Sequence, residues 1–591
     1  MLDRLENLLG SFLVWRVKYI PHRTFIIFLS VVVGLISGLG AVTLKNSTHI
    51  VQEFVSSGTF SDYYNPYYFV FPVIGIAISV VIVKILRHPV GEGIPSTLYA
   101  ISKRNGILRP YKMYASLITS MFTVGFGGSV GLEGPTVSTG SAIGSNLGRI
   151  MHLNYKSRIL LISCATAGAM ASIFNAPIAA IIFTIEIFSL DLTLASLIPL
   201  LLASVSGAVT SIFIFGNDQL FHFPIQEGFA VKELPFYIVL GVLTAFASIY
   251  FTKVFNYVDQ QFERMRKSTY RVIFGGLMIG MLIFFVPPLY GEGYETVNNL
   301  LNGNYLAVLE RSFLYSYADS AGLVLLLLFG LVMFKAFATS FTLAAGGVGG
   351  IFAPSLFIGC ALGFVFALGF NQFEPGTLQE SHFALAGMAG LMAGVLHAPL
   401  TAIFMIAEIT GGYQLFIPLM LTSATAFLVS RGIMPHSIYT RQLAKRGELI
   451  THDKDQAILT LMRLEDVVES DFVEVKQDMK LRDLVQAFSK SRRNIFPVVD
   501  EDGALRGVLT LDDFKQLLFD QKLYDKISVS ELMLAPPAVI ERSERMDEVM
   551  QKFQTTGAWN LPVTQDGRYM GFISKSKLFS AYRRKLKEVS G

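Results

Sequence analysis

Gly131-Leu132-Glu133-Gly134-Pro135 interrupts an apolar region, and Gly350-Ile351-Phe352-Ala353-Pro354 does the same about 220 residues later. Each stretch joins a glycine-rich break to a proline, which is well placed in the first turn of a new helix. In a membrane protein, two such breaks can direct two helix N-termini at one buried point. Because a helix N-terminus carries partial positive charge and unpaired N–H groups, that point attracts an anion. Glu133 places a carboxylate at the same point.

The similarity between the two regions extends well beyond these motifs and indicates an internal repeat. Glycine-rich patches also allow close helix packing in any bundle, but the paired prolines and the length of the match favour two structural repeats. Repeats of this kind in membranes are often inverted. The first copy contains Gly127, Gly131, Pro135, Gly140, Gly144, Asn175-Ala176-Pro177 and Glu186, and the second contains Gly346, Gly350, Pro354, Gly359, Gly363, His397-Ala398-Pro399 and Glu408.

Glu186 and Glu408 are repeat-related acids within apolar sequence. Buried carboxylates in membranes commonly mark function, but the equivalence of these two favours a shared structural task, such as accepting backbone N–H bonds. His397, the repeat partner of Asn175, is interpreted as a packing or hydrogen-bonding residue and not as a ligand.

Composition places the chain among multi-pass membrane proteins, since 52% of its 591 residues are hydrophobic and only 16% are charged. Cys164 and Cys360 both lie in apolar stretches, so no disulfide framework or Cys-rich metal site is expected. The sequence shows no cluster of metal ligands, and no nucleophile paired with a general base, that would indicate an enzyme. The net charge of +4 is small and spread over loops, which gives no sign of a nucleic-acid partner.

Basic residues at the ends of the apolar stretches predict the orientation. The loops 55–66, 292–310 and 371–381 carry Asp or Glu and no Lys or Arg. By the positive-inside rule, the basic loops and both termini are expected in the cytoplasm. The basic set includes Arg16, Lys18, Arg23, Lys84, Arg87, Lys103, Lys112, Arg264, Arg271 and Arg441.

Near residue 447 the composition changes to that of a soluble protein with two similar units. One contains Ile495-Phe496-Pro497-Val498-Val499 and Gly507-Val508-Leu509-Thr510, and the other contains Asn560-Leu561-Pro562-Val563 and Gly571-Phe572-Ile573-Ser574. Short apolar strands alternate with helical stretches such as 481–488 and 546–553, which predicts a small α/β pair.

These motifs, together with Gly91-Glu92-Gly93-Ile94-Pro95 and Ser437-Ile438-Tyr439, resemble the CLC family of chloride channels and chloride/proton antiporters, followed by a tandem CBS pair. The resemblance implies an α-helical polytopic membrane protein with an inverted repeat and broken helices, plus a cytoplasmic α/β CBS domain. The implied divisions are an N-terminal cytoplasmic segment at 1–23, a transmembrane anion-transport domain at 24–446, a linker at 447–461 and CBS domains at 462–525 and 526–591.

The resemblance also implies roles for single residues. Glu133 would be the gating glutamate, whose carboxylate competes with the anion. Backbone N–H groups of Ile351 and Phe352 would bind the central anion, and those of Gly134 and Leu132 would bind it slightly further out. Tyr439 would donate its hydroxyl, since a phenol holds an anion without a full charge.

Two positions depart from the commonest family pattern. Glu92 stands where many members have a serine that donates its hydroxyl to the anion. An ionised carboxylate there would repel chloride, so in a transport role Glu92 is protonated, turned toward the cytoplasmic vestibule, or replaced by a backbone amide. The alternative is a solvated helix N-cap. Ile187 stands where proton-coupled members often have a glutamate, and isoleucine cannot relay a proton. The sequence therefore favours passive or weakly coupled chloride permeation. Obligatory chloride/proton antiport is the alternative, with Glu92 or a water chain as the relay.

Thr510 and Asp513 match the Thr-x-x-Asp that holds the ribose of an adenine nucleotide in CBS domains, whereas Ser574 and Lys577 occupy those places in the second unit. The resemblance thus allows one nucleotide site, or a purely structural CBS pair, and no other cofactor. Further expected partners are chloride or a similar small anion, protons, the lipid bilayer and a second copy in a homodimer. The expected location is the plasma membrane, or the inner membrane of a bacterium.

Overall fold

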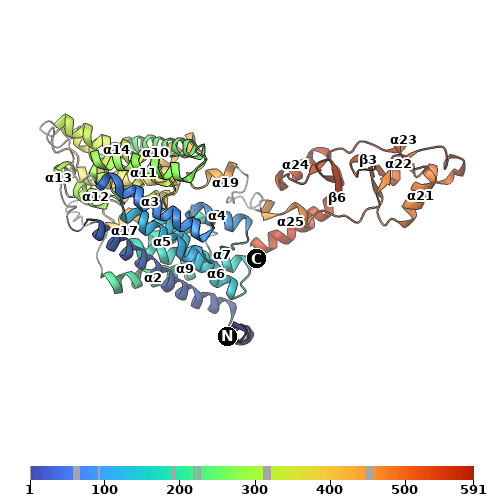
Figure 1. Cartoon of the computed structure of the whole chain (residues 1–591), viewed down its shortest axis with the longest axis horizontal. Coiled ribbons are helices and arrows are strands. Elements are labelled where there is room, and N and C mark those ends of the chain that lie inside the picture. The colour runs from blue at the N-terminus through green and yellow to red at the C-terminus, as the bar shows by residue number, and fades with distance from the viewer. Residues whose placement is uncertain are drawn as a thin grey trace. The chain divides into compact units, whose positions relative to one another are not determined.

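The computed structural model describes residues 2–56, 67–88, 90, 93–189, 193–216, 221, 228–310, 321–445, 458–459 and 461–590. The chain forms two compact units, Met1–Lys445 and Arg446–Gly591. The first unit is helical, and the second combines helices with short strands (Figure 1).

The helices of the first unit fall into two successive sets, which Figure 1 colours from blue to cyan and from green to orange. The first set consists of α1 (Leu2–Tyr19), α2 (His22–Ser56), α3 (Tyr67–Leu86), α4 (Gly93–Lys103), α5 (Lys112–Gly125), α6 (Glu133–Ile150), α7 (Tyr155–Phe174), α8 (Pro177–Phe188) and α9 (Leu194–Phe215). The second set consists of α10 (Leu234–Glu263), α11 (Ser268–Phe285), α12 (Tyr294–Leu301), α13 (Tyr305–Glu310), α14 (Ala321–Ala344), α15 (Phe352–Asn371), α16 (Glu380–Leu396), α17 (Pro399–Ile409), α18 (Phe416–Ile433) and α19 (Arg441–Lys445).

Both sets pack in the same pattern. In the first, α2 packs against α5, α7 and α9, and α6 packs against α5 and α7. In the second, α10 packs against α14, α16 and α18, and α15 packs against α14 and α16. Helix α8 packs on its counterpart α17, so the repeats also meet each other there. The internal repeat predicted from the sequence is therefore present as a repeat of helix packing.

The described part of the chain contains nine helices that are long and apolar enough to cross a membrane, and α8, α16 and α17 are shorter apolar helices. The short helices are the broken elements that the sequence predicts. Each of α8 and α17 begins with a proline directly after a residue pair that ends the preceding helix. That helix ends at Asn175 or His397, both with left-handed backbone at φ 53° and 57°. The repeat thus preserves a backbone geometry with two different side chains.

The breaks before α6 and α15 are also equivalent. Helix α5 ends at Gly125 and α14 at Ala344, and the chain then turns at Gly127 and Gly346, with φ of 92° and 103°. These values lie in the region that favours glycine, because it has no Cβ. The same turn therefore launches both half-helices.

Reciprocal hydrogen bonds join the two breaks. The Ser129 N–H donates to the hydroxyl of Thr342 at 3.1 Å, and the Val348 N–H donates to the hydroxyl of Thr123, also at 3.1 Å. All four residues are buried or partly buried. Buried backbone donors need such partners. Each repeat therefore provides a hydrogen-bond acceptor for the loop of the other repeat and holds that loop in place.

The second unit contains two copies of a β-α-β-β-α arrangement, each with a three-stranded sheet in which the first two strands are parallel and the last two antiparallel. Separate apolar cores lie around Phe496 and around Leu561. The first copy contains β1 (Val475–Lys476), α21 (Leu481–Lys490), β2 (Ile495–Val499), β3 (Leu505–Thr510) and α22 (Leu511–Phe514), and α23 (Val529–Leu532) follows it. The second contains β4 (Ile540–Glu541), α24 (Met546–Thr556), β5 (Asn560–Gln565), β6 (Arg568–Ser574) and α25 (Lys575–Ser590).

Candidate functional site

The starts of α4, α6 and α15 converge. Gly131 and Gly350 exchange two backbone hydrogen bonds, of 2.9 and 2.8 Å. A Cβ placed on Gly93, at the start of α4, would overlap the carbonyl of Gly134, and one on Gly350 would overlap the carboxylate of Glu133. Only glycine permits such close approach of backbones. The motifs that are far apart in the sequence therefore meet at one buried place.

Glu133 lies at the centre of this convergence as the first residue of α6, with only 1% of its surface exposed. Its Oε1 atom accepts a hydrogen bond of 2.5 Å from the backbone N–H of Phe352, the first residue of α15. The N–H of Ala353 also faces this carboxylate. The carboxylate thus occupies the N-terminus of α15, where backbone donors and the helix dipole favour an anion.

Two buried polar atoms at this place have no hydrogen-bond partner in the described structure, namely Oε2 of Glu133 and the hydroxyl of Tyr439. Tyr439 is 8% exposed and lies close enough to Glu133 to interact with its charge. Buried polar atoms are nearly always paired in proteins. A hydroxyl donor that has no protein partner, next to a helix N-terminus, is a suitable ligand for an anion.

The backbone amides predicted to bind the anion differ in their present partners. Phe352 donates to Glu133, whereas Leu132 donates to the carboxylate of Glu292 at 3.3 Å. Ile351 directly precedes Phe352, Gly134 lies two residues after Leu132, and both are buried. Sequence reasoning missed Glu292, which reaches α6 from a loop 160 residues further along the chain. Its only signal was an acid between two glycines, Gly291 and Gly293.

Comparison with known proteins identifies the family. The family model described as voltage gated chloride channel matches residues 74–431, and the model of the CBS domain matches residues 464–520 and 529–584. The chain belongs to the CLC family. Both parts of the predicted architecture, the CLC membrane fold and the tandem CBS pair, are thereby confirmed.

Several CLC proteins resemble this chain over most of their length. A protein of Ralstonia nicotianae, provisionally named chloride channel protein ClcB-like, is 31% identical over 363 residues, which cover 60% of this chain and 80% of the relative. The H(+)/Cl(-) exchange transporter ClcA of Vibrio cholerae is 28% identical over 437 residues, 71% of this chain and 89% of the relative. Curated relatives thus carry both channel and exchanger names.

Solved CLC structures share the fold. A slow cyanobacterial Cl-/H+ antiporter has 24% identity and a TM-score of 0.60, covering 72% of this chain and 98% of the antiporter. A eukaryotic CLC transporter has 18% identity and a TM-score of 0.61, covering 93% of this chain and 97% of the transporter. At these identities the likeness concerns the fold alone.

The two positions that depart from the CLC pattern have different outcomes. Ile187 is 9% exposed near the end of α8 and offers no titratable group at that point. Glu92 lies outside the described residues, so its two interpretations stay open. The described residues next to it, from Gly93 onward, begin α4.

Glu186 and Glu408 have the structural task predicted for them. Glu186, on α8, accepts bonds from the N–H groups of Leu400 and Thr401 at the start of α17, at 3.1 and 2.7 Å. Glu408, on α17, accepts from Ile178 and Ala179 at the start of α8, at 3.0 and 2.8 Å. Each half-helix therefore caps the N-terminus of its counterpart.

His397 has a packing role, as predicted. It closes α16 with left-handed backbone, and its ring lies edge-on to Phe427 with the ring centroids 5.9 Å apart.

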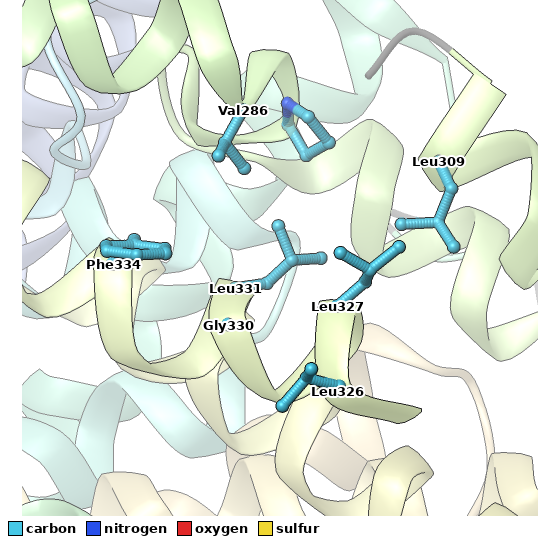
Figure 2. Close-up of a pocket in the computed structure, with 8 residues that line it drawn as sticks. Val286, Leu309, Leu326, Leu327, Gly330, Leu331 and Phe334 are labelled. Carbon is cyan, nitrogen blue, oxygen red and sulfur yellow. The ribbon is translucent and has the colours of Figure 1, made fainter. Parts of the chain in front are cut away.

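A separate pocket of about 240 Å³ lies outside this site, between the end of α11 and helices α13 and α14. Figure 2 shows Val286, Leu309, Leu331 and Phe334 around it. Its lining is apolar, and Leu326 on its rim is 63% exposed. Such a pocket has no donor or charge for an anion, so it plays no part in the candidate site.

In the CBS pair, Asp513 accepts hydrogen bonds from the N–H and the hydroxyl of Thr510, both at 2.6 Å and both through Oδ2. This is a capping box at the start of α22. Ser574, the counterpart of Thr510, donates instead to Glu469 at 2.5 Å, and Arg493 donates to the other oxygen of Glu469 at 2.7 Å. The sequence motif of the second copy lacks a carboxylate, and Glu469 therefore supplies one from elsewhere in the chain.

Proposed function

We propose that this CLC protein moves chloride across a membrane in exchange for protons. The observation that carries the proposal is Glu133, a buried carboxylate on the N-terminus of α15 with one unpaired oxygen. The similarity to exchange transporters such as ClcA supports proton coupling over simple permeation. The same residues would serve a channel, so the coupling has to be measured.

The carboxylate can act as a tethered anion. When ionised, it competes with chloride for the N–H of Phe352 and its neighbours, because both are held by the same donors. When protonated, it binds those donors less well and yields the place to chloride. Tyr439 then supplies a neutral donor to the incoming anion. Protonation of Glu133 and entry of chloride both remove the ionised carboxylate from these donors. One carboxylate therefore couples the two ions.

A chloride channel is the second candidate, and Ile187 is the observation that favours it. Without a carboxylate at this position, a proton leaving Glu133 must cross apolar surroundings, which is costly. Glu92 or a chain of water molecules would have to relay it if exchange occurs. An exchanger therefore needs such a relay, whereas a channel does not.

Reversal potentials of the purified protein in liposomes under crossed chloride and proton gradients decide between the two candidates. An exchanger gives a reversal potential that shifts with the proton gradient, and a proton gradient alone drives uphill chloride movement. A channel gives a potential that follows chloride only. If exchange is found, Glu92→Gln tests the relay, since loss of coupling with retained chloride flux would identify Glu92 as the proton site.

We further propose a homodimer with both termini and the CBS pair in the cytoplasm, in the plasma membrane or a bacterial inner membrane. The basic residues at the ends of the apolar stretches support this orientation. Large apolar side chains stay exposed on α9, including Val205, Val209 and Phe213 at 49, 53 and 90%. Mass measurement in detergent tests the dimer, and accessibility of cysteines placed in loops tests the orientation.

For the CBS pair we propose an adenine nucleotide at Thr510 and Asp513 that modulates transport. Both capping bonds use Oδ2 of Asp513, and its other oxygen can accept bonds from ribose hydroxyls. Nucleotide binding to the purified protein tests this proposal.

A further inference from the structure

Glu292 lies in a loop that is fixed against the break before α6. The loop residues on either side, Gly291 and Gly293, both have left-handed backbone, with φ of 58° and 87°. Tyr290 donates its hydroxyl to the carbonyl of Gly125 at 2.9 Å. A Cβ on Gly293 would overlap the ring of Phe357. The packing of the loop therefore fixes the position of Glu292.

The carboxylate of Glu292 meets α6 in the way that Glu133 meets α15. Its Oε1 atom accepts the N–H of Leu132, the N-cap residue of α6. Glu133 accepts the N–H of Phe352, the first residue of α15, which lies one position after the repeat partner of Leu132. Both half-helix N-termini at the anion site thus hold a carboxylate, and each carboxylate occupies donors that suit an anion.

The two carboxylates differ in their access to solvent. Glu133 is buried, at 1% exposed. Glu292 is only half-buried. As a residue, Glu292 is therefore less enclosed than Glu133.

Charged groups from several elements surround Glu292. Lys335 on α14 is fully buried and donates to the carbonyl of Gly291 at 2.9 Å. Lys45 on α2, Lys335 and Glu133 all interact with the charge of Glu292, and Tyr294 on α12 faces both carboxylates. Two ammonium groups and two carboxylates make this region neutral when all are ionised. Protonation of either carboxylate leaves a net positive charge, which favours an incoming anion.

We propose that Glu292 is a second gate, a tethered anion on α6 that chloride displaces in addition to Glu133. This inference rests on the proposed function, in which Glu133 gates an anion pathway. Ionised Glu292 holds the N-terminus of α6 closed to chloride. Protonation of Glu292, or its displacement by chloride, frees the N–H of Leu132 and adds an anion seat next to the one that Glu133 covers.

The test compares chloride efflux from liposomes for the wild type, Glu133→Gln, Glu292→Gln and the double variant. With Glu133 replaced, we expect flux that still rises roughly threefold to tenfold on acidification from about pH 7.5 to about pH 4.5, the scale of a carboxylate's interaction with a helix N-terminus. The double variant should lose this remaining rise. Glutamine keeps an acceptor for Leu132, so folding should survive. Glu295→Gln, an exposed acid on α12, is the matched control.

Chloride binding in detergent, measured by calorimetry, tests the gate separately from transport. Removal of a tethered competitor should tighten chloride binding in Glu292→Gln roughly threefold to tenfold, and Glu292→Ala should act in the same direction. Equal binding in all variants would overturn the inference, as would a Glu133→Gln flux that is already independent of pH. Absence of chloride flux in the wild type would instead refute the proposed function, and the binding comparison would still decide the role of Glu292.

Discussion

The half-helices α6 and α15 begin at equivalent breaks, yet α6 begins with Glu133 and α15 with Phe352. The half-helices α8 and α17, by contrast, carry equivalent acids, Glu186 and Glu408, and each acid caps the helix that carries the other. An acid with a repeat partner thus holds the scaffold together. Glu133, whose repeat partner Phe352 is not an acid, instead competes with an anion.

The CBS pair repeats this contrast on a smaller scale. Its two copies have the same strand order and pairing. At the start of the last helix in each copy, however, the first has Thr510 and Asp513 whereas the second has Ser574 and Lys577. In both units of the protein, the symmetric residues build the fold, and the differences between copies mark the candidate sites.

Glu133→Gln tests the asymmetric acid and should have the largest effect. A neutral amide cannot compete as an anion or carry a proton, so we expect complete loss of proton coupling. Chloride flux should persist and lose the part of its pH dependence that comes from Glu133, which is at least roughly tenfold over two pH units for a gate opened by protonation. The smaller rise that we assign to Glu292 should remain. Efflux from liposomes measured with a chloride electrode checks this. A variant that keeps the full pH dependence would remove Glu133 from the gate.

Glu186→Ala and Glu408→Ala test the symmetric acids. Each removes the acceptor of two backbone N–H groups at a half-helix start. A backbone donor left without a partner in apolar surroundings costs about 1–3 kcal/mol, so each variant should lose about 3 kcal/mol of stability and unfold at lower temperature in detergent. The two losses should be similar. If Glu186→Ala keeps its stability but loses proton coupling, the acid is functional and the contrast fails.

Much of this site could be predicted because the motifs carry backbone chemistry. The paired glycines and prolines indicate where helices break, and the comparison of the two copies suggested that Glu186 and Glu408 accept backbone bonds. Local sequence was sufficient there, because the repeat contains the same helix breaks twice and the two copies can be compared.

Glu292 could not be predicted for the opposite reason. No counterpart of Glu292 was recognised in the other repeat, and its contact with Leu132 spans 160 residues. Glu469 was missed in the same way, because its bond to Ser574 spans 105 residues. A carboxylate brought in by tertiary packing leaves no spacing pattern in the sequence.

Asp513→Ala tests whether the first CBS copy holds a nucleotide. Loss of a charge-assisted bond to ribose should weaken binding by about 1.5–3 kcal/mol. Asp513→Asn is the matched control for the capping box, since it keeps an oxygen for the Thr510 N–H but removes the charge. Calorimetry with ATP, ADP and AMP measures the change. If the wild type ignores all three at millimolar concentrations, the CBS pair is structural and its asymmetry has another cause.

Glu469→Gln tests the carboxylate that the second CBS copy borrows, and should have the smallest effect. Burial acts to raise the pKa of Glu469, but the hydrogen bonds from Ser574 and Arg493 and the charge of Arg493 outweigh it, so the pKa lies below its usual value. A carboxyl whose pKa is lowered by folding stabilises the fold above its unfolded pKa of about 4.3, and this stabilisation disappears as the pH falls through the folded pKa.

Thermal unfolding of the 447–591 fragment between about pH 3 and about pH 7 measures this contribution. Because Arg493 is 37% exposed and screened by water, we expect Glu469→Gln to cost only about 1 kcal/mol at neutral pH. The wild type and the variant should converge in stability at the acid end, where Glu469 is protonated in both states. Glu501→Gln, at an exposed acid of the same unit, is the control and should leave the curve unchanged. A difference between wild type and Glu469→Gln that stays constant with pH would show that Glu469 acts through packing, and that its charge does not compensate for the carboxylate missing from the second copy.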